Sequence, residues 1–313
     1  MSMKKSKQMI RKFFLLSLLV FICNLSFSGT NPEQSLTTKL KNTTNEFNGN
    51  VGIYVRHLKT GETVEISADS LFPTASMIKV PIMLKIFDMI DHGIMNYDDE
   101  LVWYADSIAY PYAGSILYSF QEGKSISLKI VVSLMMSYSD NHASLWCQKL
   151  AGGSQINRWL ENNGFKNTRV NSRTEGRQND WKKYGWGQTT PREMAEMLVL
   201  IREGKAVSPA ASEEMYRVLT RPYWHDVALS QIPPYIQVAC KNGAVGDSRS
   251  EVLLVNAPSG DYVFCIITKN QQDTSWNHDN EGYALILNTS RLLWEHFEPD
   301  HPWSPAMDAE KYR

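Results

Sequence analysis

The chain has 313 residues, of which 43% are hydrophobic, with 32 Lys and Arg against 33 Asp and Glu. This composition is sufficient for one large core, or for two subdomains that share an interface, and it excludes disorder as the dominant state. The charge balance is not basic, which argues against nucleic acid as a partner.

The first 28 residues have the pattern of a secretory signal peptide. Basic residues precede an uncharged apolar run over 13–27, and small residues follow it, which predicts cleavage just before Gly29. A membrane-spanning helix would need about 20 apolar residues. We therefore expect export across the inner membrane to the periplasm without a retained anchor. Lipid attachment at Cys23 is the weaker alternative, because a bulky Ile22 precedes it.

The mature chain is expected to be acidic. The signal peptide contains five of the 32 basic residues and no acidic residue, which leaves 27 basic against 33 acidic residues and a net charge of about −6. Three cysteines remain, Cys147, Cys240 and Cys265, an odd number without the spacing of a zinc site. We expect buried free thiols, with a bridge between Cys240 and Cys265 as the alternative.

The folded part is predicted to begin with a hairpin. Residues 29–45 are polar and rich in Thr, Asn and Ser, which predicts an N-terminal arm that leads into a first helix, so the catalytic domain is expected over 46–313. Within it, the stretches 51–57 and 63–67 alternate apolar and polar residues across the turn 59–62. This pattern is typical of two antiparallel strands.

Three further strands are predicted near the other end of the chain, over 236–240, 251–255 and 262–268. Together with the hairpin they make a five-stranded antiparallel sheet. Between the two groups of strands, apolar residues recur at helical spacing. We predict helices there over 79–90, 128–137, 142–150, 154–162 and 192–202. A last amphipathic helix, 281–297, is expected to return over the sheet.

The first candidate catalytic pair is Ser76 and Lys79, in the segment PTASMIKVP at the start of a predicted helix. Side chains three residues apart project from one face of a helix, so the amine can reach the hydroxyl. A neutral amine can take the Ser proton and activate this weak nucleophile. The N–H groups of the helix start favour the negative charge of acyl transfer. Taken alone, the pattern also fits an ordinary helix start with a solvated Lys.

A second polar element, Ser139-Asp140-Asn141, falls between two predicted helices. The hydroxyl of Ser139 can relay a proton to a leaving amine, and the amide of Asn141 can hold a substrate carbonyl or orient the Lys. Asp140 is expected to brace the turn. A simple N-cap for the following helix is the alternative interpretation.

The third element is the tripeptide Lys-Asn-Gly at 241–243, at the end of a predicted strand. Gly243 allows a ligand to approach the backbone closely. The backbone N–H of Ala244 is predicted to form an oxyanion hole with that of Ser76. In isolation the tripeptide would predict only a turn.

The three elements, 63 residues (76 to 139) and 102 residues (139 to 241) apart, resemble the SxxK, SDN and KTG motifs of β-lactamases and penicillin-binding proteins. The resemblance to the class A β-lactamase family extends over the mature chain, including the segment TTPREMA at 189–195. It implies an α+β fold, with a three-layer α/β/α domain beside an all-α domain and the active site between them. The α/β part is then about 46–75 and 205–313, and the all-α part about 76–204.

The resemblance also implies a residue that hydrolyses the acyl-enzyme. The segment RTEGRQN at 173–179 is similar to the RxExxxN pattern of the family's Ω-loop, and Glu175 lies 16 residues before Pro191. Glu175 is therefore the predicted deacylation base, Asn179 helps to hold the water, and Arg173 braces the loop. The alternative is that Glu175 is an ordinary exposed loop carboxylate.

Several positions depart from the family pattern. Asn242 replaces the usual Thr or Ser, so an amide replaces a hydroxyl donor beside Lys241 and Arg249, the cations expected to attract a substrate carboxylate. Gln188 stands where an Asp usually pairs with the Ω-loop arginine, so that brace is expected to be missing. Gly176 stands where many members carry Pro.

The sequence thus predicts a metal-free, cofactor-free serine β-lactamase that forms an acyl-Ser76 intermediate. Lys79 and Glu175 are the predicted bases, and Ser139 the proton relay. The predicted substrate-binding residues are Asn141, Asn179, Lys241, Asn242, Gly243 and Arg249. One aromatic at the rim, from Tyr104, Tyr110 and Tyr112, is expected to pack against a small-molecule substrate, and the protein is expected to be a monomer.

Two alternatives use the same cleft. The first is a D-Ala-D-Ala carboxypeptidase, or another serine hydrolase of this fold, which penicillin would trap as an acyl-enzyme. The second is an idle binding or sensor domain, which would form no covalent adduct. The joint presence of Ser76, Lys79 and Ser139 argues against the idle domain.

Overall fold

The computed structural model describes residues 35–108, 110 and 114–312. The predicted signal peptide (1–28), Cys23 and Tyr112 lie outside the described residues. Within the described ranges, no helix has the length and apolar character needed to cross a membrane. The part of the chain that begins at Leu36 forms one unit, and the following description concerns this unit.

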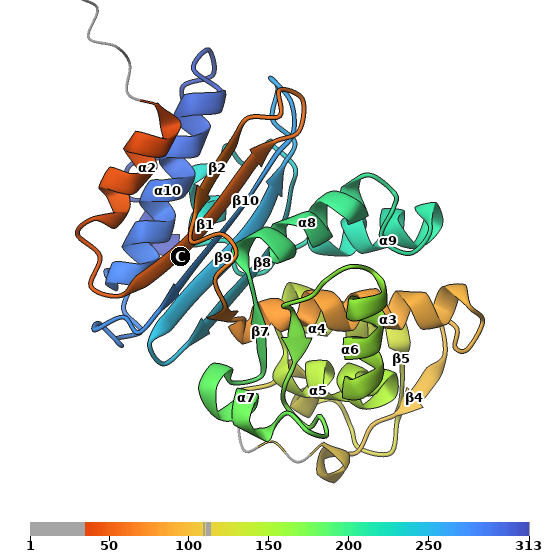
Figure 1. Ribbon diagram of the computed structural model, residues 1–313. Coiled ribbons are helices and arrows are strands. Elements are labelled where there is room, and N and C mark those ends of the chain that lie inside the picture. Colours follow the sequence, from red (N-terminus) through yellow and green to blue (C-terminus); the bar gives the residue numbers. More distant parts are fainter. Residues whose placement is uncertain (1–34, 109, 111–113, 313) are drawn as a thin grey trace, which may run out of the picture. The chain divides into compact units, whose positions relative to one another are not determined.

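A five-stranded antiparallel sheet lies at the centre of this unit, as the sequence predicts (Figure 1). In spatial order its strands are β2 (Thr63–Ile66), β1 (Asn50–His57), β10 (Tyr262–Lys269), β9 (Ser248–Val255) and β8 (Val238–Val245). The first and last strands of the sequence lie side by side, because β1 pairs with β10 from Asn50 opposite Lys269 to His57 opposite Tyr262. β8 is an edge strand, so one of its edges remains available beside the helices.

Helices cover both faces of the sheet. α2 (Leu36–Thr44) and α10 (Glu281–Phe297) cover one face, and α8 (Pro191–Arg202) covers the other (Figure 1). Successive side chains of β10 therefore enter two different cores: Phe264 packs under α10, whereas Cys265 faces α8. Burial on both faces explains why β10 is apolar at almost every position, whereas β9, buried along its whole length, is apolar only in its second half, residues 252–255.

The boundary predicted at residue 46 is wrong. The segment 29–45, predicted as an arm, contains α2, and its Leu36 and Leu40 are buried beneath α10 in the core. Only these two leucines, four residues apart, mark the helix in an otherwise polar stretch, and they are enough to hold it on the sheet. The folded unit therefore begins at Leu36.

The predicted division between the two parts is also corrected. α8 falls within 76–204, the range assigned to the all-α part, yet it packs on β1, β9 and β10. Its buried stripe, which includes Met194 and Leu198, faces the sheet core and the helices at once. α8 is thus the third layer of the α/β part.

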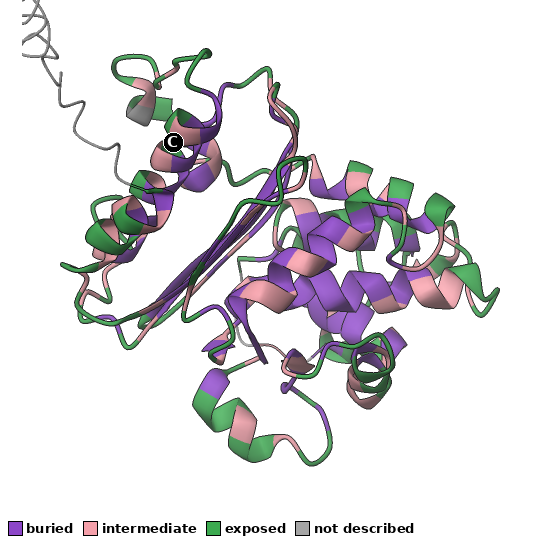
Figure 2. Cartoon of the chain, turned by 45° about the horizontal axis from the view of Figure 1, so that its top comes forward, coloured by how far each residue is buried: buried purple, intermediate pink, exposed green. Residues whose placement is uncertain are grey.

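The remaining helices pack around α3 (Lys79–Asp91), which follows the short 3-10 turn η1 (Ala75–Ile78). They are α4 (Leu128–Ser137), α5 (Asn141–Ala151), α6 (Gly153–Asn162) and α9 (Pro209–Leu219). Each predicted helix is confirmed to within one residue at either end, whereas α9 and the short α7 (Gln178–Tyr184) were not predicted. Figure 2 shows the buried residues concentrated in the sheet and on the inward faces of these helices.

Short strands form two further groups. β3 (Phe72–Pro73), β7 (Gly187–Thr189) and β6 (Arg169–Val170) make a three-stranded group between the helical part and the sheet, and β4 (Glu100–Val102) pairs with β5 (Ser125–Ser127) within the helical part, between α3 and α4. β3 leads directly into η1. The start of the catalytic turn is therefore tied to the segment that precedes α8.

Capping residues fix the helix starts near the site. The Asp140 side chain accepts from Ala143 N at the start of α5, and Thr190 caps α8, where Pro191 occupies the first turn. The expected role of Asp140 as a brace is confirmed. Because the capping residue Asp140 directly follows Ser139, the cap also fixes the position of that serine.

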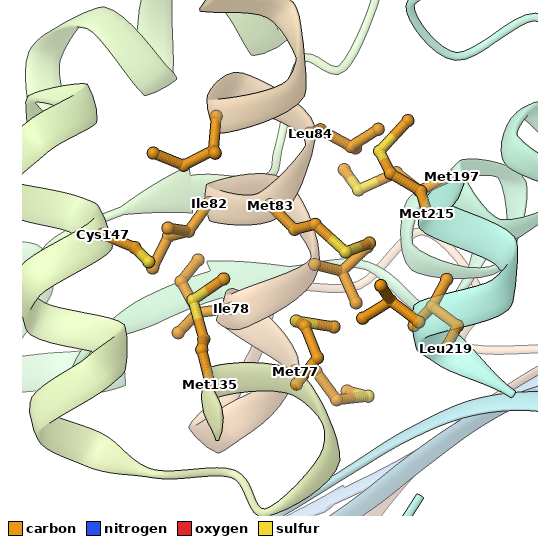
Figure 3. Close-up of a cluster of buried hydrophobic side chains, with 14 of the residues drawn as sticks. Met77, Ile78, Ile82, Met83, Leu84, Met135, Cys147, Met197, Met215 and Leu219 are labelled. Atoms are coloured by element: carbon orange, nitrogen blue, oxygen red, sulfur yellow. The ribbon is translucent and has the colours of Figure 1, made fainter. Parts of the chain in front are cut away.

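A core rich in sulfur surrounds α3 (Figure 3). Its buried side chains include Met77, Met83, Met135, Met197, Met215 and Cys147. Met77 and Ile78 stand between Ser76 and Lys79 in sequence and are completely buried. Unbranched methionines fill irregular gaps well, so the turn that carries the catalytic pair is anchored on its inner side.

The cysteines are free and buried, as expected. Cys240 and Cys265 lie on strands that β9 separates, and their side chains belong to cores on opposite faces of the sheet. A bridge between them is therefore excluded by geometry.

Candidate active site

Two strained residues mark the place where η1 meets the start of α5. Ala75, directly before Ser76, has φ 43°, and Ser139 has φ 59°. A non-glycine residue in this region costs about 1–3 kcal/mol and persists only where its surroundings hold it. The strain thus falls on the residue directly before Ser76 and on Ser139 itself, next to the two hydroxyls that the sequence predicts to be catalytic.

The Lys79 amine joins these positions. Its Nζ lies 2.9 Å from Ser76 Oγ, 2.9 Å from Ser139 Oγ, 2.6 Å from the Ser139 carbonyl oxygen and 2.9 Å from Asn141 Oδ1. A neutral amine has two N–H groups and one lone pair. Two neighbours can therefore accept from Lys79 while its lone pair accepts the Ser76 hydroxyl proton.

The surroundings favour this neutral form. Complete burial lowers the pKa of Lys79 well below its ordinary value, the charge of Lys241 lowers it further, and Asp140 opposes the shift. Burial also lowers the pKa of Lys241 to about 8. A lowered pKa increases the fraction of the neutral amine, which is the form that can act as a general base toward Ser76.

Asn141 is held from two sides. Its Oδ1 accepts from Lys79, and its Nδ2 donates to the hydroxyl of Tyr110 at 3.3 Å. The preceding Asp140 is buried and accepts from Ser115 Oγ at 2.7 Å. These contacts keep the amide at the mouth of the cleft, where a substrate carbonyl would meet it.

Tyr104 and Tyr110 are the two rim tyrosines that the structure describes, and Tyr110 lies at the site. Its ring makes edge contacts with Trp186 and His142, at centroid distances of 5.4 and 5.3 Å. Tyr104 is 53% exposed and lies outside the hollows that contain Ser76, and Tyr112 lies outside the described residues. Of the two described rim tyrosines, Tyr110 is thus the one that lines a hollow containing Ser76.

β8 supplies the backbone beside the nucleophile. A Cβ on Gly243 would lie 2.9 Å from Ser76 N and 2.8 Å from the Thr74 carbonyl oxygen. Only glycine allows the strand to pass this close to η1, and the passage brings the main chain of Ala244 beside Ser76. This is the arrangement that the predicted oxyanion hole requires. The tripeptide lies within β8 and not at its end, because the strand continues to Val245.

Lys241 and Asn242 form a unit on this strand. The buried Lys241 Nζ donates to the Asn242 carbonyl oxygen at 3.0 Å and to its Oδ1 at 2.9 Å. Since the amide oxygen is occupied, the NH2 group of Asn242 is the part that can donate to a ligand. The side chain that replaces the usual hydroxyl therefore still offers a donor.

Two hollows meet at Ser76. The first hollow, of about 710 Å³, contains Ser76, Ser139, Asn242 and Gly243 at one end. The second hollow, of about 730 Å³, contains Ser76, Asn141, Tyr110 and Ala244. Both are lined by Ala244 and by Trp276, so a ligand bound at Ser76 can extend in two directions.

Arg249 does not contact either hollow, which corrects its prediction as a substrate-binding residue. It is completely buried, and its guanidinium donates to backbone oxygens that include Gly246 O at 3.0 Å and Ser275 O at 2.5 Å. The rings of Trp276 and Tyr283 lie 4.7 and 4.9 Å from it. Arg249 thus holds the β8–β9 turn to the loop before α10, and its guanidinium donates to backbone oxygens of these two segments.

Glu175 is not placed beside the catalytic pair. It is exposed and lines a third hollow, of about 570 Å³, which contains Tyr110 and Trp186 but not Ser76. The neighbouring Thr174 points inward instead, where its hydroxyl donates to Ser172 O at 3.0 Å. Glu175 is therefore not found at its predicted position near Lys79, and its role as a base stays a prediction.

The rest of this segment also differs from expectation. Asn179 is exposed on α7, outside the lining of the three hollows. The contact at position 188 that was expected to be missing is made by Arg177: its guanidinium donates to Gln188 Oε1 at 2.9 Å and to Asn171 Oδ1 at 2.8 Å. Two amides replace the acid of the family pattern.

Sequence reasoning missed three side chains of the first hollow. Glu251 faces it from β9, opposite Asn242, and Trp224 and Trp276 border it. Glu251 was visible only as the first residue of a predicted strand. The tryptophans lie in loops without periodicity, so only the folded arrangement identifies them as part of the site.

The comparison with known families decides the identity. The model of the beta-lactamase enzyme family matches residues 35–297. The chain belongs to the beta-lactamase enzyme family. The sequence-based prediction of a class A-like serine β-lactamase and of its fold is thereby confirmed, since the match extends from α2 to the end of α10.

Individual relatives have low sequence identity to this chain, but the similarity covers nearly the whole of each relative. The β-lactamase VEB-1 of Pseudomonas aeruginosa is 22% identical over 299 residues, which cover 92% of this chain and 98% of VEB-1. The solved structure of PBP-A is 25% identical, with a TM-score of 0.73 over 84% of this chain and 96% of PBP-A. A β-lactamase from Chitinophaga pinensis is 20% identical, with a TM-score of 0.75 over 84% of this chain and 99% of that protein. A PBP-A mutant, 26% identical to this chain, was solved as an acyl-enzyme complex with penicillin G.

Proposed function

We propose that this β-lactamase attacks the lactam carbonyl with Ser76 and releases the acid by slow hydrolysis of the acyl-enzyme. The observation that carries the proposal is the completely buried Lys79 amine, 2.9 Å from Ser76 Oγ, whose pKa is lowered by burial. The Ser76 hydroxyl is a weak nucleophile, and a neutral amine at this distance can activate it by taking its proton.

The acylation step follows from the contacts. Lys79 takes the proton of Ser76 as Oγ forms a bond to the lactam carbonyl carbon. The oxyanion is stabilised by the N–H groups of Ser76 and Ala244. Ser139, which also contacts Lys79, donates its hydroxyl proton to the ring nitrogen as the C–N bond breaks and takes up the proton that Lys79 removed from Ser76, so both side chains return to their starting forms. Asn141 holds the acyl side chain in the second hollow.

Deacylation is the step for which the site is least prepared. Water must reach the acyl carbonyl and lose a proton to a base, yet Glu175 is exposed in a different hollow. A base that does not contact the reacting water contributes little. We therefore expect acyl-Ser76 to accumulate during turnover.

The same observation favours a second candidate function. A serine peptidase that cleaves D-Ala-D-Ala-like amides uses the same acylation machinery but is trapped by β-lactams when hydrolysis of the acyl-enzyme is slow. The acyl-enzyme of the PBP-A mutant with penicillin G supports this candidate. The two functions differ in the lifetime of the penicilloyl adduct.

A time course with benzylpenicillin tests both. Intact mass is followed after mixing, with Ser76→Ala as the control that must form no adduct. An adduct that forms and then disappears as free penicilloic acid accumulates supports the β-lactamase. A wild-type adduct that persists for hours supports the peptidase, and absence of an adduct contradicts acylation of Ser76 altogether.

We further propose that the chain is exported to the periplasm as a monomer and that its activity confers resistance to β-lactams. Export is supported by the basic and then apolar start of the sequence. The test is the mass of the protein recovered from a periplasmic extract: cleavage before Gly29 is expected, and a full-length chain retained in the cytoplasm would contradict export.

A further inference from the structure

Glu175 and Ser76 lie in different hollows, and the same two side chains border both. The third hollow contains Glu175, whereas the second contains Ser76. Among the described residues, Tyr110 and Trp186 are the two that line both of these hollows. Their side chains therefore form the wall between the predicted deacylation base and the nucleophile.

This wall consists of two aromatic rings in contact. The ring centroids of Tyr110 and Trp186 are 5.4 Å apart, and the ring planes are inclined by 78°. Edge-to-face packing of this kind is a favourable arrangement for aromatic side chains. The Tyr110 hydroxyl also accepts from Asn141 Nδ2, and Asn141 in turn contacts Lys79. The wall therefore extends up to the catalytic cluster.

The main chain fixes Trp186 between α7 and β7. Its carbonyl oxygen accepts from Asn171 N at 2.8 Å and from Ser172 N at 3.1 Å. The next residue, Gly187, is buried, and a Cβ at this position would collide with the side chain of Ile78. Because the backbone passes this close to η1, the fold itself sets the place of the indole.

The third hollow has room for water beside a base. Its volume is about 570 Å³, and polar side chains such as Ser172, Gln178 and Glu175 line it. A water molecule in the liquid takes up about 30 Å³, so the hollow can hold several. Glu175 is exposed there, so both the water and the base that hydrolysis needs are available on this side of the wall.

The wall keeps this water away from the acyl carbon. A general base acts only within hydrogen-bond reach of the proton that it takes, directly or through one water. An aromatic face offers water no ordinary hydrogen bond, so water does not replace the contact between the two rings. While the rings are in place, Glu175 therefore cannot activate a water at acyl-Ser76.

We propose that Trp186 limits deacylation, because its indole, packed on Tyr110, separates Glu175 and the water of the third hollow from acyl-Ser76. The inference rests on the proposed acylation of Ser76. Trp186 is a positioning residue in this scheme, since it acts through the access of water to the acyl carbon.

The second and third hollows join when the indole is removed. The oxygen of a water then forms a bond to the acyl carbon, and Glu175 takes one of its protons. As the bond from this carbon to Ser76 Oγ breaks, the proton passes from Glu175 to Oγ. The products are the free acid and the original Ser76 hydroxyl, and Glu175 is again a carboxylate.

Four proteins test the wall: wild type, Trp186→Ala, Glu175→Gln and the double variant. Each is acylated with benzylpenicillin, the free compound is removed, and loss of the penicilloyl adduct is followed by intact mass. In Trp186→Ala the adduct should decay about tenfold to hundredfold faster than in wild type, which is the lower part of the range for general bases. In the double variant the decay should return to within about threefold of wild type, because the base is absent.

Two further variants separate the wall from a general effect on structure. Trp181 lines the third hollow but not the second, so Trp181→Ala is the matched control and is expected to leave the adduct lifetime unchanged. Trp186→Phe keeps an aromatic ring in the wall and is expected to keep the wild-type lifetime. Damage to the fold would instead slow acylation, and its effect would not depend on Glu175.

The outcomes distinguish this inference from the proposed function. Trp186→Leu, a smaller change, keeps the test valid if Trp186→Ala does not fold, and it should shorten the lifetime in the same Glu175-dependent way. An unchanged lifetime in the folded variant, or a shortening that persists without Glu175, would overturn the role of the wall while the adduct itself still supports acylation. If wild type forms no adduct at all, both proposals fail.

Discussion

Lys79 and Glu175 are the two bases that the sequence predicts, and the fold treats them in opposite ways. Lys79 is completely buried, and its Nζ lies within hydrogen-bonding distance of the side chains of Ser76, Ser139 and Asn141. Glu175 is exposed, on a segment whose inward-pointing residue is Thr174. The residues that form the acyl-enzyme are thus fixed before substrate binds, whereas Glu175, the residue expected to hydrolyse it, is not.

The difference has a structural origin. Lys79 is the first residue of α3, a helix packed on all sides by other helices and by the sulfur-rich core (Figure 3). Glu175 lies between β6 and α7, in a connection fixed mainly by hydrogen bonds such as those of Arg177 with Asn171 and Gln188. A buried position on a helix fixes a side chain more closely than a surface loop does.

Removal of the buried base should give the largest effect. Lys79→Met keeps the length of the side chain but has no lone pair to take the Ser76 proton, so we expect acylation by benzylpenicillin to fall about 10³-fold, within the range for general bases. Lys205→Met, on an exposed residue beyond α8, is the control. A loss of less than tenfold in Lys79→Met would mean that another group deprotonates Ser76.

The same base sets the pH dependence of acylation. The neutral amine is the active form, and burial lowers the pKa of Lys79 well below 10.5. Acylation should therefore continue well below pH 10.5 and decline only as the pH falls through that lowered pKa. A rate that rises until about pH 10 would show that the amine is protonated in the free enzyme.

The buried acid of the cleft is expected to affect folding stability. The Glu251 pKa is raised from 4.5 to about 7, so the folded state binds a proton that the unfolded state has already lost between these values. The stability from this group is complete below about pH 4.5 and is lost as the pH rises through 7, by up to about 3 kcal/mol. Glu251→Gln should lack this loss.

Urea unfolding of wild type and Glu251→Gln at pH 5 and pH 8 measures this difference. Titrating groups common to both proteins, such as His57 and His142, cancel when the two pH differences are compared. Lys241, whose pKa is about 8, acts mainly above this window. Equal pH dependence in the two proteins would show that Glu251 is not desolvated as the structure indicates.

Gly243→Ala tests the backbone part of the buried region. The added Cβ would lie 2.9 Å from Ser76 N and 2.8 Å from Thr74 O, so β8 must move away from η1 and take the N–H of Ala244 with it. Loss of one oxyanion donor costs about 10²-fold or more in rate. Because both close contacts are with backbone atoms, the strand itself must shift, and we expect a loss of acylation of about tenfold to hundredfold. Thermal unfolding of the same variant checks that the fold is intact, and an unchanged rate would contradict the oxyanion hole.

The contrast between the two bases also explains how far the sequence could be interpreted. Periodicity located the sheet and most helices, because long apolar stripes are local in sequence. It expected a first helix after the polar arm and not within it, because α2 has only Leu36 and Leu40 to mark it. It also placed α8 in the wrong part, because the partner strands of α8 are distant in sequence.

The same limit applies to the site. Ser76, Lys79, Ser139 and Asn141 were predictable, since short spacings and helix starts determine their directions. Arg249 was not, because nothing local indicates that its guanidinium turns toward backbone oxygens under Trp276. Glu251 was missed because its role depends on the cavity that faces β9.

Substitution of the exposed Glu175 should have the smallest effect on the reaction, and its result decides the comparison of Lys79 with Glu175. With its carboxylate in a hollow that does not contain Ser76, Glu175→Gln is expected to change the deacylation rate of penicilloyl-Ser76 less than threefold and to leave acylation unchanged. The matched control is Glu161→Gln, an exposed acid on α6. A lifetime of the adduct that lengthens by a hundredfold in Glu175→Gln alone, the effect of a true general base, would show that segment 173–179 rearranges after acylation and carries Glu175 to the water. The contrast between a fixed and a loose base would then describe only the free enzyme, and binding of substrate would be the event that completes the site.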